Sequence, residues 1–264
     1  EIKRIKDMQV NIHTKVMVNK EIFDNLTVEY DAVVISVGAH IPMVIPFEGH
    51  ERLIKGLDFL KSINNGIKPT VGDKVVVIGA GNAAMDVIAG AYKVGAKQVT
   101  AIDIQKPAAF QKEIDYAEKL GAKILWPCYT EKISEKGVHL KNGSLIEADT
   151  VIISIGDRPD FSFLDRNWLD EKGKIKVNEY LQSEQNPKVF VIGDAVKQGL
   201  FANALGDGYK TAKNIDNYLS GKLLSEFEKA PIIPQDKVKH EYYCKLDQTK
   251  VNEMQIEEET QRCM

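Results

Sequence analysis

The chain has 264 residues, with 38 acidic and 35 basic side chains and a formal net charge of −3. This length suits two modest domains. The lack of a basic excess argues against a nucleic-acid partner, and no apolar run is long enough to cross a bilayer, so no membrane partner is expected. A total of only three cysteines favours the reducing cytoplasm.

The sequence lacks the motifs of several kinds of catalytic site. Cys128, Cys244 and Cys263 lie far apart and form no C-x-x-C pair, which argues against a dithiol redox centre. The five histidines show no metal-ligand spacing, so we expect no metal site. There is neither a G-x-S-x-G elbow nor a P-loop. We therefore name no catalytic acid, base or nucleophile.

The N-terminal segment is expected to form β-structure. Val10, Ile12, Val16 and Val18 share one parity, as the side chains on one face of a strand do. The chain begins at Glu1, without methionine and inside this expected β-region, so we expect a fragment of a longer protein.

A hairpin and a buried strand come next. The turn residues Asp24-Asn25 predict the hairpin, and the strand lies within Tyr30–Gly38. It ends at a glycine, where a backbone can come close to a ligand.

The most specific motif follows. Val75–Ile78 is a continuous apolar run, typical of a parallel strand buried on both faces. Three small residues then fill the slots of a G-x-G-x-x-G/A loop: Gly79, Gly81 and Ala84. The first permits a sharp turn, the second leaves room for a pyrophosphate, and the third lets the helix pack closely. Free amides at the helix start, at Asn82 and Ala83, favour phosphate, so the motif predicts a dinucleotide site.

The helix after this loop should end at Gly95, a plausible C-cap. A second buried strand, Val99–Ile104, contains Asp103, 24 positions after Gly79. An acid there suits the ribose hydroxyls of NAD and repels a 2′-phosphate, which favours NAD(H) over NADP(H). Lys106 could offset that preference by pairing with a phosphate. The alternative is a tight strand–helix turn in some other α/β domain, with Asp103 at a solvated strand end.

The strand that ends at Gly38 has a second copy. Val33–Gly38 reads Val-Val-Ile-Ser-Val-Gly and Val151–Gly156 reads Val-Ile-Ile-Ser-Ile-Gly, each two residues after an aspartate. The second copy follows a predicted hairpin turn at Asn142-Gly143. Chance similarity of two apolar strands is the alternative, but the shared flanking residues favour duplication. The second copy closes a unit that opens with the Gly79 loop, so we expect the loop of the first unit upstream of Glu1.

A further buried strand, Val189–Asp194, ends in Gly193-Asp194. A helix is predicted from about Gly208 to Gly221. Four residues should lie along one face of it: Tyr209, Ala212, Ile215 and Leu219.

Together these residues resemble the two-dinucleotide-domain flavoprotein oxidoreductases, and most closely the small (β) subunit of glutamate synthase. The resemblance runs from about residue 20 to the C-terminus. It implies an α/β fold in which a Rossmann-like three-layer NAD(P)-binding domain, residues 56–157, is inserted in a partial FAD-binding domain, residues 1–55 and 158–222. A linker and helical tail, residues 223–264, would follow.

The resemblance also implies roles for individual residues. The Gly79–Ala84 loop, Asp103 and Gly156 would hold NAD(P)H, with the nicotinamide near Gly156. Gly38, Gly193 and Asp194 would belong to the FAD site, with Asp194 on the ribityl chain. In the parent protein, electrons would pass from NAD(P)H through FAD to iron–sulfur clusters or a larger catalytic subunit. Arg262-Cys263 is similar to the start of a cysteine-rich iron–sulfur domain in some relatives, with a plain helical tail as the alternative.

Two other functions remain open. The chain could be a nicotinamide-binding or docking module without turnover, or a reductase subunit of the ferredoxin–NAD(P) oxidoreductase type. A truncated FAD domain would leave buried strands at an edge and expose apolar surface, which a homodimer could hide. No residue identifies the electron acceptor.

Overall fold

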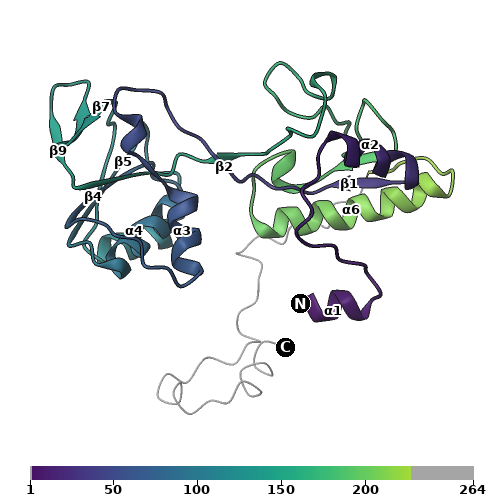
Figure 1. Ribbon diagram of the computed structural model, residues 1–264, viewed down its shortest axis with the longest axis horizontal. Helices are drawn as coiled ribbons and strands as arrows, with labels where there is room; N and C mark the ends of the chain where they lie inside the picture. The colour runs from purple at the N-terminus through teal and green to yellow at the C-terminus, as the bar shows by residue number, and fades with distance from the viewer. Residues whose placement is uncertain (1, 227–264) are drawn as a thin grey trace, which may run out of the picture. The chain divides into compact units, whose positions relative to one another are not determined.

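A five-stranded parallel sheet is built from the most apolar segments of the chain. The computed structural model describes residues 2–226 (Figure 1). The strand order in this sheet is β3-β10-β4-β5-β6. Their bounds are β3 (Ile54–Lys55), β4 (Lys74–Ile78), β5 (Gln98–Ile102), β6 (Lys123–Leu125) and β10 (Thr150–Ile153). Val77 pairs with Ile152 on one side and with Ala101 on the other. All three side chains are buried, as expected for strands covered on both faces.

Three helices cover one face of this sheet, namely α3 (Gly56–Asn64), α4 (Asn82–Val94) and α5 (Gln111–Lys119). Phe59, Val87 and Ala117 from these helices pack in one cluster with Val75 and Val77 of β4. These β4 residues alternate along the strand and so point to the same side.

A second, antiparallel sheet covers the opposite face. It consists of β7 (Thr130–Ser134), β8 (Gly137–Leu140) and β9 (Leu145–Glu147). Ile133 and Val138 pack against Val76 and Ile78, the β4 residues of the other parity. The arrangement is therefore three layers, of helices, parallel sheet and antiparallel sheet, and the predicted Rossmann-like α/β fold is confirmed.

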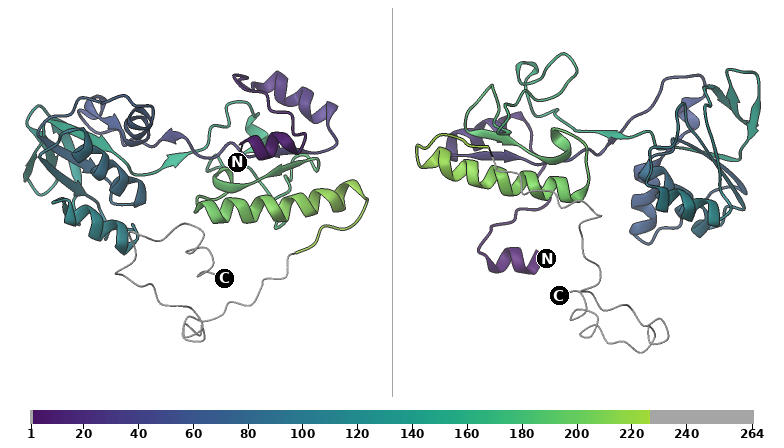
Figure 2. Two further views of the ribbon diagram at one scale, coloured as in Figure 1. Left: turned by 90° about the horizontal axis from the view of Figure 1, so that it is seen from below. Right: turned by 180° about the vertical axis from the view of Figure 1, so that it is seen from behind.

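A smaller parallel pair of strands, β1 (Val33–Ile35) and β12 (Val189–Val191), has its own helices. Figures 1 and 2 show α2 (Lys20–Glu29) and α6 (Phe201–Leu219) on opposite sides of this pair. The ring of Phe23 in α2 meets those of Phe163 and Trp168 edge-on, with centroid distances of 5.4 and 5.3 Å. On the α6 side, Phe190 meets Tyr218 at 6.2 Å.

The repeated strands lie in different sheets, because β1 pairs with β12 whereas β10 lies between β3 and β4. A short antiparallel pair joins β2 (Ile41–Pro42) to β11 (Asp157–Arg158). The remaining elements are α1 (Ile2–Asp7), η1 (His50–Arg52), η2 (Arg166–Trp168) and η3 (Gly193–Ala195). The domain boundaries given above stay a prediction. Within residues 2–226, none of the helices combines the length and apolar character that crossing a bilayer requires.

Two predictions for the N-terminal part are wrong. Residues 8–19 contain no strand and are exposed, so the alternation of valines reflects no buried face. The predicted hairpin at Asp24-Asn25 is instead the middle of α2. The Asn19 side chain caps this helix by accepting the Ile22 amide at 2.9 Å, and Phe23 anchors it with only 3% of its surface exposed.

The last helix also differs from its prediction. α6 starts at Phe201, upstream of Gly208. Its buried residues are Thr211 and Asn214, whereas Tyr209 and Leu219 are 61% and 55% exposed.

The turn predicted at Asn142-Gly143 is confirmed between β8 and β9. The prediction for the tail extends past residue 226, and Arg262-Cys263 lies outside the described residues.

The position of β10 between β3 and β4 gives a stability prediction. Ile152→Ala removes a fully buried side chain from a strand that is paired on both edges, so we expect a loss of about 2–5 kcal/mol in the free energy of unfolding. Ile67→Ala, at a residue that is 60% exposed, should change it by less than about 0.5 kcal/mol. Urea denaturation of both variants measures the difference. Equal losses would contradict the placement of β10.

Candidate functional site

The sharp turn after β4 is fixed by the absence of a side chain at Gly79. Its φ angle is +119°, and a Cβ atom there would overlap the carbonyl oxygen of Ser154, just after β10. Its amide donates to the carbonyl oxygen of Ile102 at the end of β5, at 2.8 Å. Gly79 therefore joins the carboxyl ends of three neighbouring parallel strands, the place where α/β sheets bind ligands.

The next glycine opens the start of α4 to solvent. Gly81 has an ordinary φ of −85°, and a Cβ built on it meets no heavy atom within 4 Å. Within residues 2–226, the amides of Gly81, Asn82 and Ala83 have no hydrogen-bond partner. Three unsatisfied N–H groups at the N-terminus of a 13-residue helix form a binding place for a phosphate or pyrophosphate.

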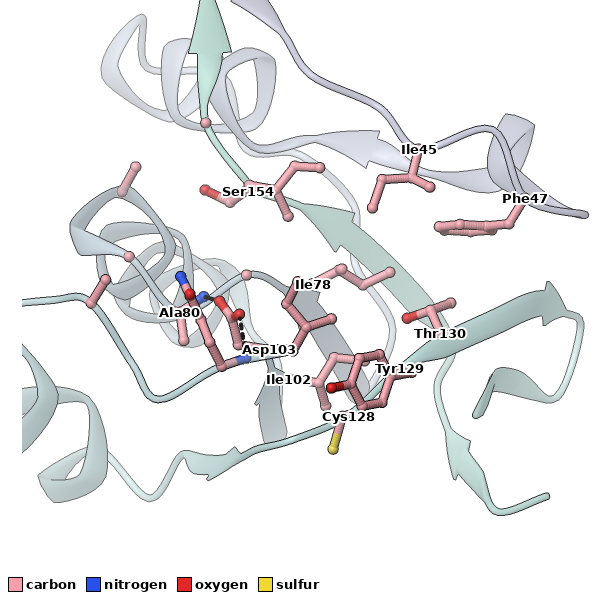
Figure 3. Close-up of a pocket in the computed structure, with 18 of the residues that line it drawn as sticks. Ile45, Phe47, Ile78, Ala80, Ile102, Asp103, Cys128, Tyr129, Thr130 and Ser154 are labelled. Atoms are coloured by element: carbon pink, nitrogen blue, oxygen red, sulfur yellow. Dashed lines mark hydrogen bonds between the residues drawn. The ribbon is translucent and has the colours of Figure 1, made fainter. Parts of the chain in front are cut away.

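A cavity of about 600 Å³ lies in front of these amides (Figure 3). This volume is in the range of small-molecule and cofactor sites. Its wall includes Ser154 and Gly156 after β10, the glycine turn, and Asp103, Tyr129 and Lys141. The rest of the wall is largely apolar, with side chains that include Ile45, Phe47, Ile78, Ile102, Ile104 and Cys128.

The carboxylate of Asp103 points toward the glycine turn. Figure 3 shows its hydrogen bonds: Oδ2 accepts the Ala80 amide at 2.8 Å, and Oδ1 accepts the Gln105 amide at 3.1 Å. Asp103 is half-buried, directly after β5. Both carboxylate oxygens thus already have a backbone donor.

The segment after Asp103 is bonded to the same turn. The amides of Ala108 and Ala109 donate to the carbonyl oxygen of Ala80 at 3.1 and 3.3 Å. The side chain of Asn82 accepts the amide of Phe110 at 2.8 Å. The glycine turn and residues 103–110 therefore form one hydrogen-bonded unit.

The structure brings most of the predicted nucleotide-site residues to one cavity. Six of them line it: Gly79, Gly81, Asn82, Ala83, Asp103 and Gly156. Ala84 lies beneath it, fully buried in the helical core, as close helix–sheet packing requires. Lys106 is exposed and does not line the cavity.

The predicted FAD residues lie elsewhere. Asp194 lines a second cavity of about 340 Å³, and its Oδ1 accepts the Gly199 amide at 3.0 Å. Gly38 and Gly193 have φ angles of +66° and +63°, and a Cβ on Gly38 would meet nothing within 4 Å. These residues fit part of a flavin nucleotide. Asp194 can still accept a hydrogen bond from a group in its cavity, but this cavity is too small for a whole FAD. In the part of the chain that the structure describes, no group of three or more His, Cys, Asp or Glu side chains could hold a metal ion.

Sequence reasoning missed the residues that the antiparallel sheet brings to the first cavity. Cys128 and Tyr129 precede β7, and Lys141 follows β8. No local motif marks them, because their position depends on how β7–β9 fold over the parallel sheet. Burial raises the pKa of the Cys128 thiol above its usual value, which keeps it protonated and weakly nucleophilic at neutral pH.

Two known proteins are similar to this chain in sequence. The chain is 31% identical to the NADP(+)-dependent formate dehydrogenase subunit beta of Moorella thermoacetica, over 83% of this chain and 36% of that protein. It is 27% identical to the NAD-dependent dihydropyrimidine dehydrogenase subunit PreT of Escherichia coli (strain K12), over 84% and 56%. The chain thus spans between about a third and just over half of these relatives' length.

A solved structure shares the fold. The thioredoxin reductase of T. acidophilum superimposes with a TM-score of 0.57 and 24% identity, covering 72% of this chain and 66% of that chain. The model of one protein family, pyridine nucleotide-disulphide oxidoreductase, matches residues 2–214. The chain therefore belongs to the pyridine nucleotide-disulphide oxidoreductase family, whose members are oxidoreductases that bind FAD and NAD(P)H.

Proposed function

We propose that this chain is the electron-input part of a flavoprotein oxidoreductase of the glutamate synthase small-subunit type. In the parent protein, electrons would pass from NAD(P)H through FAD to iron–sulfur clusters or to a larger catalytic subunit. The observation that carries the proposal is the row of unpaired amides at Gly81, Asn82 and Ala83, facing a cavity of cofactor size. The relatives named as subunits of NAD(P)-dependent dehydrogenases support it.

Different parts of the cavity wall would have different roles. The Gly79–Ala84 loop would bind the pyrophosphate through backbone amides, Asp103 would lie beside the adenosine and Gly156 beside the nicotinamide, since both of these residues line the cavity. Gly156 has a φ angle of +108°, and a Cβ there would come within 3.0 Å of Met43 Cε. Glycine at this position therefore avoids a collision with the Met43 side chain. The nicotinamide and the flavin supply the redox chemistry, and the chain binds and orients them.

The flavin would be held by a second set of residues. Asp194 would accept a hydroxyl of the ribityl chain, while Gly38 and Gly193 allow the backbone to come near the cofactor. The small volume beside Asp194 suits one portion of FAD, so the rest of the flavin site would come from chain other than residues 2–226. A larger subunit, an iron–sulfur protein or a second copy of this chain are the partners we propose, in the cytoplasm.

We also propose that NADH is preferred to NADPH. The negative charge of Asp103 beside the adenosine would repel a 2′-phosphate. A cation lines the same cavity, but it is Lys141, whereas Lys106 lies outside the wall. Lys141 would reduce the preference for NADH over NADPH, because its positive charge attracts the 2′-phosphate of NADPH.

Two alternative functions share the same nucleotide site. A docking module that binds NADH without turnover is favoured by the small size of the cavity at Asp194. A reductase subunit of the ferredoxin–NAD(P) oxidoreductase type would use the same cofactors but another acceptor. The genes next to the complete coding sequence would separate the acceptors.

Gly81→Val tests the nucleotide site. A Cβ at this position meets no heavy atom within 4 Å and φ is −85°, so the variant should fold normally while its methyl groups crowd the place of the pyrophosphate. Overpacking of about 1–3 kcal/mol predicts NADH binding that is roughly 5- to 150-fold weaker by calorimetry. Gly206→Val, in α6, is the control and should leave NADH affinity unchanged, because a Cβ there also meets no heavy atom within 4 Å and the residue does not line the cavity. An unchanged affinity in Gly81→Val would rule out this site.

Lys141→Ala tests the source of cofactor preference. Loss of its charge should weaken NADPH binding about two- to fivefold while NADH binding stays the same, as an exposed ion pair predicts. Lys106→Ala is the matched control, because this lysine does not line the cavity. Fluorescence titration with both nucleotides gives the ratio. A larger change in Lys106→Ala than in Lys141→Ala would refute the role of Lys141.

The absorption spectrum of the purified full chain separates flavoprotein from docking module. Bound flavin gives a band near ~450 nm, which we expect to weaken in Asp194→Ala. A colourless wild-type protein that still binds NADH would support the docking module instead.

A further inference from the structure

Four basic side chains from three separate parts of the chain line the cavity beside Asp194. One ends β11, two lie on either side of the turn at Gly173, and one comes shortly after η3. These residues, which we call the basic rim, are Arg158, Lys172, Lys174 and Lys197. All four are exposed. Because like charges repel one another, their convergence on one cavity favours an anionic partner.

The basic rim is not neutralised inside the described part of the chain. Within residues 2–226, none of its four side chains makes an ion pair or donates a hydrogen bond. Two carboxylates share the cavity wall, those of Asp157 and Asp194, and Oδ1 of Asp194 accepts the Gly199 amide at 3.0 Å. Four positive charges thus face two negative ones, in a chain whose formal net charge is −3.

A further carboxylate, that of Asp170, serves the backbone of the same turn. Its Oδ1 accepts the amides of Lys172 and Lys174, both at 2.8 Å, and Asp170 does not line the cavity. The Lys174 amide and the charges of both lysines lower the pKa of Asp170, so this carboxylate stays ionised and offsets part of the positive potential. The ammonium groups of both lysines still have no bonded partner within residues 2–226 and can bind an external anion.

The cavity between these charges also has apolar walls. Met43, Phe161 and Val196 line it, and Met43 is 40% exposed. Apolar contact surface inside a ring of exposed charges is the usual composition of a protein interface, with its apolar centre and polar rim. A small inorganic anion would make no use of the apolar walls, whereas an acidic protein can offer an apolar side chain flanked by carboxylates.

We propose that the basic rim is the docking surface for an acidic electron-acceptor protein that carries an iron–sulfur cluster. A cluster held by four thiolates is itself anionic, so opposite charge favours its approach to this face. The role of this partner as acceptor rests on the function proposed above, whereas its docking by charge does not. A small interface formed mainly by charge is typical of transient redox partners, which have to leave after electron transfer.

The probe is an acidic two-iron ferredoxin in its oxidised form. Calorimetry measures its binding to the full 264-residue chain at about 10 mM and about 150 mM salt, where the Debye length is about 30 Å and about 8 Å. We expect a one-to-one complex at low salt. Its dissociation constant should be about tenfold larger at the higher salt, because exposed charges are then screened.

Charge reversal locates the surface. Lys172→Glu combined with Lys174→Glu should weaken ferredoxin binding about tenfold at low salt, because two attractions become repulsions. Lys68→Glu combined with Lys123→Glu makes the same change in net charge at exposed lysines outside the cavity wall, and should weaken binding less than about twofold.

A neutral variant keeps the test valid if the reversed one does not fold. Lys172→Gln combined with Lys174→Gln adds no negative charge beside Asp170 and keeps both backbone bonds to it, so only the attraction is lost. The expected weakening is about threefold at low salt. NADH affinity should stay the same in all of these variants, since none of the changed lysines lines the nucleotide cavity.

Three results would overturn the proposal. The first is the absence of ferredoxin binding by the wild-type chain at low salt. The second is an equal loss of binding in the rim variant and in its control, which would reflect net charge alone. The third is micromolar binding of inorganic pyrophosphate that the rim variant loses while it still binds ferredoxin, which would assign the basic rim to a small anion. A wild-type chain that fails to bind NADH would instead count against the proposed function, and the ferredoxin titration would still decide the role of the rim.

Discussion

The structure depends on the close meeting of three strand ends at Gly79. The amide of Gly79 bonds to the end of β5, and the carbonyl oxygen of Ser154 after β10 occupies the space where a side chain would stand. The Ser154 amide in turn donates to Ile78 at 2.7 Å. Because these contacts leave no room for a side chain at Gly79, the chain turns away from the sheet at this residue. That turn sets the first helical residues of α4, and so the direction in which its free amides point.

The strand–turn–helix unit could be predicted from sequence because its constraints are local. An apolar run, two glycines and a helical repeat follow one another along the chain, and together they predict the strand, turn and helix that β4 and α4 form. The glycine turn between β8 and β9 is local in the same sense. The α/β class and the membership of the oxidoreductase family follow from these short segments together with the repeated strand.

Other parts could not be predicted, because their signals depend on distant partners. The segment around Asp24 has turn-forming residues, but Phe23 buries its ring against Phe163 and Trp168, and that packing holds a helix. α6 continues through two glycines, Gly206 and Gly208, which local propensity places near a helix end. Tyr129 and Lys141 enter the cavity wall only because an antiparallel sheet folds over the parallel one. The role of a carboxylate can be similarly hidden, since Asp103 was identified by position and its bonds to the turn are visible only in three dimensions.

The strand order also constrains how the sheet assembles during synthesis. β3 has no neighbour in its sheet except β10, and β10 is formed by residues about a hundred positions later. During synthesis, β4, β5 and β6 can therefore pair before β10 has been made, whereas β3 has no partner strand in this sheet until then. When β10 emerges, it must enter between β3 and β4, closing the loop with the largest entropic cost in the sheet. The cavity in front of the glycine turn, whose wall includes Ser154 directly after β10, is completed only at that step.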